Sequence, residues 1–414
     1  MGSSTKGYKS ICLEFASESE YQEKLKDKKA YRKYLDGSYQ KYPELFPSEM
    51  GKGYTFCGFT ESKKQEISMR RIKLKKNNEV YQIRPSFMMP YMVGKTDQLE
   101  KGLYLRKWGV PFEVLAYVFG GSAMFWYRAY ISLGRPSIVG TTIKDVELLP
   151  KDLLADEKHT WINGDKIYAA TTVAQGCLLG VGIAESAGTV DLTKAYKEFQ
   201  TEALALDPNY QPQTVNTDGW LPTQQAWQQL FPTITQILCF LHSFLKIEKR
   251  AKRSKELFEI LSEKAWHIYH STNRTQFAQR IRRLREWALE NIDAPELLAK
   301  VLELYVNSPL FQIAFDYPNS YRTSAHLDRL MNYQDRILYA AQYFHGTLQS
   351  AKLYLRAAAL LWNFHPYGTR TRSNFPNRRS PFEDLNGFRY HDNWLHNFLI
   401  ASSLGGKSFK HKKR

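Results

Sequence analysis

From about residue 149 onward, apolar and polar residues alternate in patterns that predict strands and helices in a fixed order. Turn pairs, Asn163-Gly164 and Gln175-Gly176, separate the first strand-like runs. Later segments repeat apolar residues at helical spacing. The expected strands are 153–162, 166–174, 177–183, 214–217 and 234–241, and the expected helices are 192–206, 222–230 and 324–344. The expected order of elements at the start of the core is therefore three strands, a helix, a strand, a helix and a strand.

This order is the one that a ribonuclease H-like fold requires, because an antiparallel meander continues into right-handed parallel crossovers. A long segment with helical spacing, 243–305, is dense in Lys, Arg, Trp and Leu and separates the last expected strand from the last expected helix. We therefore expect an α/β protein whose ribonuclease H-like mixed-sheet core spans 149–345. An all-helical insertion at about 243–320 interrupts that core.

Ahead of the core, the region 96–148 has the outline of a helix-turn-helix. The run 111–119 is apolar at helical spacing, Gly120-Gly121 breaks it, and Ser122 is suited to cap a second helix. An ordinary helical hairpin explains the same pattern equally well. If the unit reads DNA, the second helix lies in the major groove. The residues expected to contact DNA are then Trp126, Tyr127 and Arg128.

The two ends of the chain are less informative. Residues 1–95 mix short strand-like runs with charge clusters, and their pattern names no fold; binding to DNA ends is one role for them. The region 346–414 is basic. Within it, 369–379 is rich in Arg, Asn and Pro and is expected to be irregular, and the tail 407–414 is highly charged.

Charge then narrows the class of partner. The chain has 58 Lys and Arg against 41 Asp and Glu, a net charge of +17, which favours a polyanion, with nucleic acid ahead of an anionic membrane. No run reaches the roughly 18 to 20 apolar residues of a membrane-spanning helix, and the segment from Met1 to Lys9 has no apolar core of a secretory signal. Four widely spaced cysteines fit reduced thiols. We expect a cytoplasmic protein that binds double-stranded DNA and no membrane.

Acidic residues at the ends of the expected core strands are candidates for metal ligands, because phosphodiester chemistry uses two divalent ions about 4 Å apart. Asp156 lies in the first strand; its neighbour Glu157 is a rival that points to the opposite face of a regular strand. Asp218 ends a short strand and precedes Gly219, where the chain turns towards a helix. The alternatives are a surface acid for Asp156 and an ordinary Asp-Gly turn for Asp218.

The third ligand is expected from the late helix, at Asp328 or Asp335. The two are seven residues apart on one helix face, about 10 Å, so only one of them binds the same metal pair. We favour Asp328, near the helix start beside His326, and regard Asp335 as the acid of an ion pair. Cys239 and His242 are expected to support the active site. A closed zinc site is not expected, because no second Cys and His pair at zinc-ligand spacing accompanies them. The alternative to a role in the active site is that Cys239 and His242 are structural residues packed in the core.

Together these motifs resemble bacterial insertion-sequence transposases of the Mutator-like type. The likeness covers about 150–345 and depends on Asp156-Glu157-Lys158-His159, Thr217-Asp218-Gly219-Trp220, Cys239-x-x-His242 and the helix of Asp328. It implies an acidic triad of Asp156, Asp218 and Asp328 that holds two Mg²⁺ ions, with Mn²⁺ as the alternative. The family's third acid is usually Glu, so Asp328 departs from its pattern.

The resemblance also implies binding to the inverted ends of a mobile element, hydrolysis that frees a 3′-hydroxyl, and attack of that hydroxyl on target DNA. For such an activity we expect a homo-oligomer that assembles on DNA in a bacterial cytoplasm. Two other classes stay open: a ribonuclease H-like nuclease or resolvase, which shares the acids but does not join DNA, and a domesticated DNA-binding protein, which needs no acids.

Overall fold

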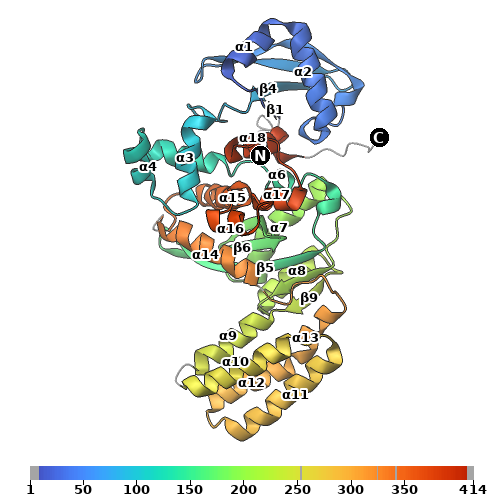
Figure 1. Ribbon diagram of the computed structural model, residues 1–414, viewed down its shortest axis with the longest axis vertical. Coiled ribbons are helices and arrows are strands. Elements are labelled where there is room, and N and C mark those ends of the chain that lie inside the picture. Colours follow the sequence, from blue (N-terminus) through green and yellow to red (C-terminus); the bar gives the residue numbers. More distant parts are fainter. Residues whose placement is uncertain (1–8, 252–253, 324, 341–342, 408–414) are drawn as a thin grey trace.

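The protein has a mixed α/β structure with two sheets and a separate helical unit (Figure 1). The computed structural model describes residues 9–251, 254–323, 325–340 and 343–407, without the side chains of Ala325, His326 and Asp328. A small sheet lies at the top of Figure 1, a larger sheet in the middle and the helical unit at the bottom.

The N-terminal region, whose pattern named no fold, forms the small sheet, with strand order β1-β4-β3-β2. Strand β1 pairs parallel with β4, and the other neighbours pair antiparallel. Buried apolar side chains such as Ile72 and Ile83 on the sheet and Tyr31 on a helix join the layers. The elements are β1 (Ser10–Leu13), α1 (Glu18–Lys26), α2 (Lys28–Lys41), β2 (Tyr54–Ser62), β3 (Ile67–Leu74) and β4 (Val80–Pro85).

The expected helical hairpin follows. Gly120 and Gly121 both have φ +78°, a backbone conformation that glycine adopts without strain, so the chain reverses between the two helices. Ser122 caps the second helix by accepting a hydrogen bond from the Phe125 N–H. The helices of this region are α3 (Thr96–Arg106), α4 (Phe112–Phe119), α5 (Ala123–Ser132) and α6 (Ile138–Thr142).

The larger sheet has the strand order β7-β6-β5-β8-β9. Strands β5, β6 and β7 form an antiparallel meander, and β8 and β9 extend the sheet in parallel from β5. The predicted succession of strands and helices is confirmed. The elements are β5 (Asp152–Ile162), β6 (Asp165–Ala174), β7 (Cys177–Ala184), α7 (Thr189–Leu206), β8 (Thr214–Thr217), α8 (Leu221–Leu230) and β9 (Thr235–Leu238).

One predicted boundary is wrong. The fifth strand was expected to run to residue 241, but β9 ends at Leu238 and helix α9 (Phe240–Ala251) begins at once. The last strand contact is the Cys239 N–H, which donates to the Thr217 carbonyl. Phe240 then packs in the core of the helical unit rather than in the sheet. The continuous apolar run ITQILCFL suits a buried strand and a buried helix start equally well.

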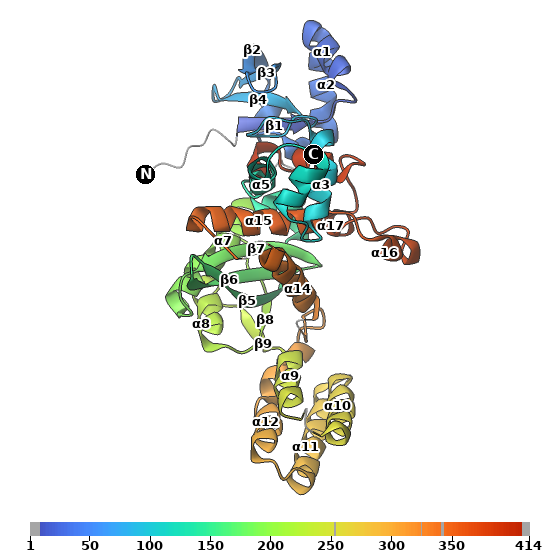
Figure 2. The same cartoon turned by 90° about the vertical axis from the view of Figure 1, so that its left-hand side faces the viewer.

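Helices cover both faces of the larger sheet. Alternate residues of β5 divide between them: Leu153 and Ala155 pack with α7 and α8, whereas Leu154 and Ile162 pack on the side of α14 (Ala325–Ala340) and α15 (Leu348–Phe364). Figure 2 shows α8 and α14 on opposite sides of the sheet. The side chains at even positions of β5 therefore lie on the α14 side.

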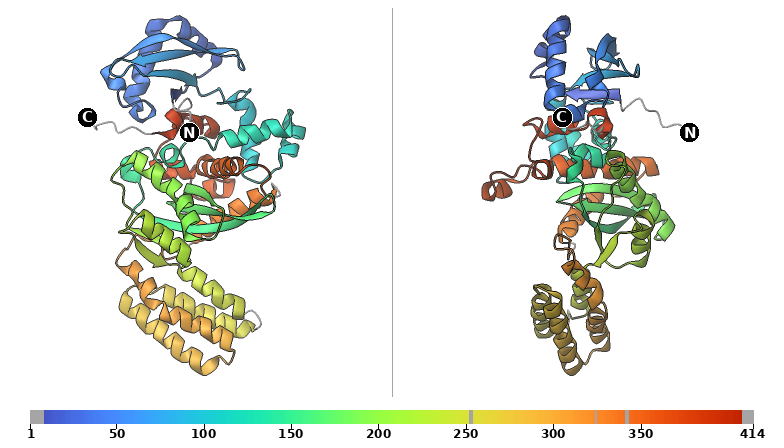
Figure 3. Two further views of the ribbon diagram at one scale, coloured as in Figure 1. Left: turned by 180° about the vertical axis from the view of Figure 1, so that it is seen from behind. Right: turned by 90° about the vertical axis from the view of Figure 1, so that its right-hand side faces the viewer.

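The expected helical insertion has a hydrophobic core of its own, built around residues such as Leu261, Ile281 and Val301. It lies beyond the β9 edge of the larger sheet, which α13 contacts, and away from the small sheet (Figure 3). Besides α9, its helices are α10 (Lys255–Tyr269), α11 (Arg274–Asn291), α12 (Pro295–Val306) and α13 (Ser308–Gln312).

The C-terminal region is more ordered than its composition predicts. Helix α15 packs on β7, and α18 contacts β1 of the small sheet. The segment 369–379, expected to be irregular, begins with a helix, and its Arg378 pairs with Asp384. The remaining helices are α16 (Thr369–Asn374), α17 (Pro381–Asn386) and α18 (Trp394–Ala401). Most of the predicted charged tail, 408–414, lies outside the described residues.

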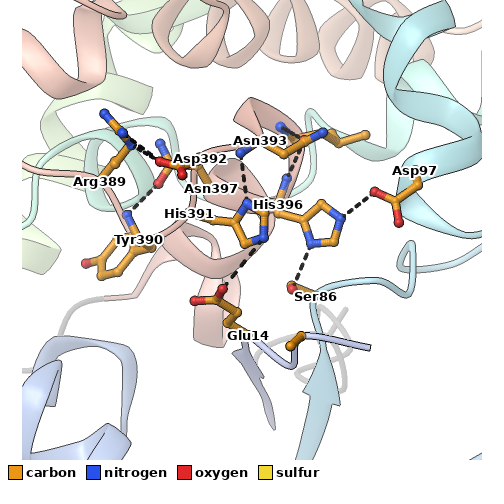
Figure 4. Close-up of polar contacts among 12 residues, drawn as sticks. Glu14, Ser86, Asp97, Arg389, Tyr390, His391, Asp392, Asn393, His396 and Asn397 are labelled. Carbon is orange, nitrogen blue, oxygen red and sulfur yellow. Dashed lines mark hydrogen bonds and ion pairs between the residues drawn. The ribbon is translucent and has the colours of Figure 1, made fainter. Parts of the chain in front are cut away.

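A histidine joins α18 to the small sheet and to α3 (Figure 4). Its Nε2 lies 3.0 Å from Asp97 Oδ1 and its Nδ1 lies 2.9 Å from Ser86 Oγ. The ring of this residue, His396, also stacks on His391 at 4.5 Å. Ser86 is completely buried, so this Ser-His-Asp arrangement has no open nucleophile. We interpret it as a structural link between the two ends of the chain.

Lys144, which follows α6, links α6 to α18, and its titration is testable. The ammonium donates to the carbonyls of Gly140 and Ala401, and burial lowers the pKa of Lys144 to about 7. An unfolded lysine titrates at about 10.4, so between these values the unfolded chain binds one more proton, and stability rises with pH.

We therefore expect wild type to gain stability relative to Lys144→Met between pH 7.0 and 8.5, by at most about 1.4 kcal/mol per pH unit. Denaturant unfolding at both pH values measures this difference. The exposed Lys255→Met is the control and should show no such trend. A difference between wild type and Lys144→Met that does not change with pH would contradict the assignment.

Candidate functional site

The two acids at the start of β5 face opposite sides of the sheet. Glu157 Oε1 accepts hydrogen bonds from Tyr196 of α7 at 2.7 Å and from Thr223 of α8 at 2.6 Å. Burial raises the pKa of Glu157 to about 7 despite these bonds, and the charges of Asp156 and Asp218 add to the rise. Asp156 is at an even position, on the α14 side. Glu157 is thus a packed carboxyl, and Asp156 is the candidate ligand.

Asp218 follows the neighbouring parallel strand at the equivalent level. Leu154 pairs with Asn216 in the β5–β8 register, so Asp156 and Asp218 each come two residues later on adjacent chains. Both aspartates lie close enough to Glu157 to raise the pKa of that carboxyl. The two aspartates, on separate sequence segments, therefore lie together at the carboxyl end of β8, where α/β sheets commonly bind ligands.

The turn after β8 holds Asp218 in place. Its Oδ1 accepts the Trp220 N–H at 2.8 Å, and Gly219 has φ +88°. A Cβ on Gly219 would lie 2.5 Å from Leu238 Cδ1, so the space beside β9 also favours glycine. The Asp-Gly turn is real, and one carboxylate oxygen of Asp218 takes part in it.

His242 lies beside Asp156. It is in the first turn of α9, and its Nε2 is 3.8 Å from Asp156 Oδ2. Cys239 is buried directly after β9. The structure thus brings His242 to the acidic pair and places Cys239 in the packing beneath it. The sequence predicted both residues at the end of a strand. Cys239 does follow β9 directly, but His242 lies in a helix, because α9 starts at Phe240.

The late helix contributes an ion pair and leaves the third ligand a prediction. Asp335 pairs with Lys158 at 2.6 Å, and its side chain is 46% exposed. Lys158 is two residues beyond Asp156 on β5, so α14 lies along the same face of the sheet. The side chain of Asp328, two turns earlier in α14, lies outside the described residues.

The acidic pair suits a divalent cation in its chemistry. Two carboxylates on one side of the sheet supply the hard oxygen ligands that Mg²⁺ prefers. Within the part of the chain that the structure describes, no group of three or more His, Cys, Asp or Glu forms a complete metal-binding cluster. The two aspartates alone offer fewer ligands than such a cation takes.

Of the three residues of α5 that were expected to contact DNA, only Arg128 is exposed. Trp126 is 2% exposed, and its indole N–H donates to the Gly120 carbonyl, so it is a packing residue and not a DNA contact. Tyr127 is half-buried and packs on Phe112, whereas Arg128 is exposed. The exposed face of α4 is apolar rather than basic, with Val114, Tyr117, Val118 and Phe119.

The positive charge lies elsewhere, and this signal was present in the sequence. Residues 1–95 have 19 Lys and Arg against 11 Asp and Glu, and 346–414 have 12 against 3. Residues 96–345, which include the hairpin and the larger sheet, have 27 of each. The two basic regions are joined in space, for example by the hydrogen bond from Tyr390 to Glu44. We call these two regions together the terminal module.

No protein-family model matches the chain, and no curated protein matches its sequence. Among the described helices, none has both the length and the apolar character needed to cross a lipid bilayer.

The tight turn at Asp218 leads to a prediction about Gly219. Gly219→Ala should destabilise the protein by about 1 to 3 kcal/mol more than Gly176→Ala. Both glycines have positive φ, but a Cβ at Gly176 would meet nothing within 4 Å. The comparison of unfolding free energies therefore isolates the contact with Leu238. Equal losses in the two variants would show that this contact does not constrain the turn.

Proposed function

We propose that the protein is a transposase: a metal-dependent enzyme that cuts DNA and joins the freed 3′-hydroxyl to target DNA. The observation that carries the proposal is the β5–β8 register, which sets Asp156 beside Asp218. The strand order β7-β6-β5-β8-β9 supports a ribonuclease H-like core, and the helical unit after β9 has the position expected of the insertion. The net charge of +17 suits a DNA substrate.

Each residue of the site has a separate task in this proposal. Asp156 and Asp218 hold divalent cations, Mg²⁺ or Mn²⁺, and Asp328 completes the ligand set from α14. Bound metal would activate the attacking oxygen and stabilise the leaving oxygen of the phosphodiester. His242, beside Asp156, is placed to contact a phosphate oxygen. Glu157 stays packed against α7 and α8 and holds β5 in position.

Water and DNA are the only reactants that the two steps consume. In the first step, water attacks phosphorus, and the bond to the 3′-oxygen breaks, which leaves a 3′-hydroxyl. In the second step, that hydroxyl attacks a phosphodiester of target DNA, so that one P–O bond forms as another breaks. A nuclease or resolvase with the same acids would perform the first step only.

Alanine at either aspartate tests the site. Asp156→Ala and Asp218→Ala should each reduce Mg²⁺-dependent cleavage and strand transfer by orders of magnitude and leave DNA affinity nearly unchanged, because the affinity comes from basic residues elsewhere. Gel assays of cleavage and joining, together with fluorescence anisotropy for binding, measure both effects. Asp328→Ala should behave like the other two if it is the third ligand.

Asp335→Ala is the matched control on the same helix. It removes an exposed ion pair with Lys158, which is worth at most about 1 kcal/mol, so activity should stay close to that of wild type. If Asp335→Ala is inactive and Asp328→Ala is active, the third ligand is Asp335. Full strand transfer by Asp218→Ala would exclude the metal site and favour a non-catalytic DNA-binding protein. Cleavage without joining would favour the nuclease.

A further inference from the structure

The terminal module contains a large cavity that shares no residue with the acidic pair. It has a volume of about 760 Å³, within the range of small-molecule and cofactor sites. The tip of the β2–β3 hairpin, the loop after β4, the segment after α5 and the C-terminal helices α15 and α18 all line it. Segments distant in sequence therefore meet around one space. Most of them belong to the terminal module, and one, with Ser132, Arg135 and Pro136, lies outside it.

The charged side chains that line the cavity are all cationic. Lys64, Arg84 and Arg135 line it, and no Asp or Glu is among the described residues that do. Lys64 and Arg135 are exposed, so their charges are available to a ligand. Arg84 is buried and donates to the Met88 carbonyl, which fixes its guanidinium in the wall. Such a lining favours an anion over a neutral or cationic ligand.

The lining also includes neutral polar residues, such as Ser62, Gln65 and Gln349, and an aromatic ring that is exposed to solvent. Tyr91 is 55% exposed, and the Arg135 guanidinium lies 4.5 Å from the centre of its ring. Its φ of +68° is costly for a bulky residue, so the surrounding loop keeps the ring in place against a strain of about 1 to 3 kcal/mol. Side chains of polarizable methionine complete this part: Met69, Met88, Met89 and Met92.

We propose that this cavity binds one nucleotide of a DNA strand, with the base against Tyr91 and the methionines and the flanking phosphates at Lys64 and Arg135. A stacking surface beside cations is the arrangement by which proteins hold single nucleotides of a strand. The choice of DNA as the polyanion rests on the proposed function. In this proposal the terminal module, together with Arg135, holds the strand while the acids of the larger sheet act on it.

The first experiment measures the affinity for a fluorescein-labelled thymidine oligonucleotide by anisotropy at low salt. Lys64→Ala combined with Arg135→Ala should weaken binding about tenfold or more, because two phosphate contacts are lost. The control, Lys197→Ala combined with Arg283→Ala, removes the same charges from exposed positions outside the cavity and should weaken binding less than about threefold. Equal weakening of the two double variants would overturn the proposal, because it would indicate only a general effect of charge.

The second experiment tests the base. Wild type should bind the thymidine oligonucleotide about tenfold more tightly than an abasic oligonucleotide of equal length and charge, since stacking one base is worth about 1 to 3 kcal/mol. Tyr91→Ala, at an exposed position, should remove that preference and leave the affinity for the abasic strand unchanged. Equal affinity of wild type for both strands would reduce the cavity to an anion site and overturn the nucleotide proposal.

The two proposals fail in distinguishable ways. If wild type binds neither strand, both the cavity proposal and a DNA-directed function are wrong. If binding depends on Lys64, Arg135 and Tyr91 but no DNA is cut, only the proposed catalytic function is wrong. If DNA is cut and joined but the cavity variants bind normally, only the cavity proposal is wrong.

Discussion

The parallel hydrogen bonding of β5 to β8 is the constraint on which the candidate site depends. It sets the register in which Leu154 lies opposite Asn216, so the two aspartates that follow are brought to one level of the sheet. A shift of one residue would turn Asp156 to the opposite face and bring Glu157 to its place. The burial of Glu157 against Tyr196 and Thr223 opposes that shift, since it occupies the other face with a hydrogen-bonded carboxyl.

The sheet also explains how a C-terminal region becomes part of the core. One side of the sheet is covered by α14 and α15. Residues 348–364 therefore pack on strands that lie far before them in the sequence. From α15 the chain continues to α18. There His396 contacts Ser86, directly after β4, and the Ala401 carbonyl accepts a hydrogen bond from Lys144, which follows α6. Through these contacts the two basic ends of a chain with a neutral middle form one module, and its cavity is remote from the acids.

Local patterns predicted the core well, and long-range contacts account for what they missed. The strand 214–217 and most of the neighbouring elements follow from alternation and turn residues, and the side of Glu157 follows from the period of a strand. The small sheet depends on pairing between β1 and β4, about 70 residues apart, which no local pattern reveals. Similarly, Trp126 fits an exposed or a buried helix face equally well until Gly120 and its neighbours are placed around it.

The central claim is that Asp156 and Asp218 belong to the same divalent metal site. Iron-directed cleavage of the protein backbone would test it. Fe²⁺ in place of Mg²⁺, with ascorbate and peroxide, generates hydroxyl radicals that cut the chain close to the bound ion. The account predicts cuts next to residues 156 and 218 that excess Mg²⁺ suppresses and that Asp218→Asn abolishes. Cuts confined to other segments, or cuts at these positions that persist in Asp218→Asn, would contradict it.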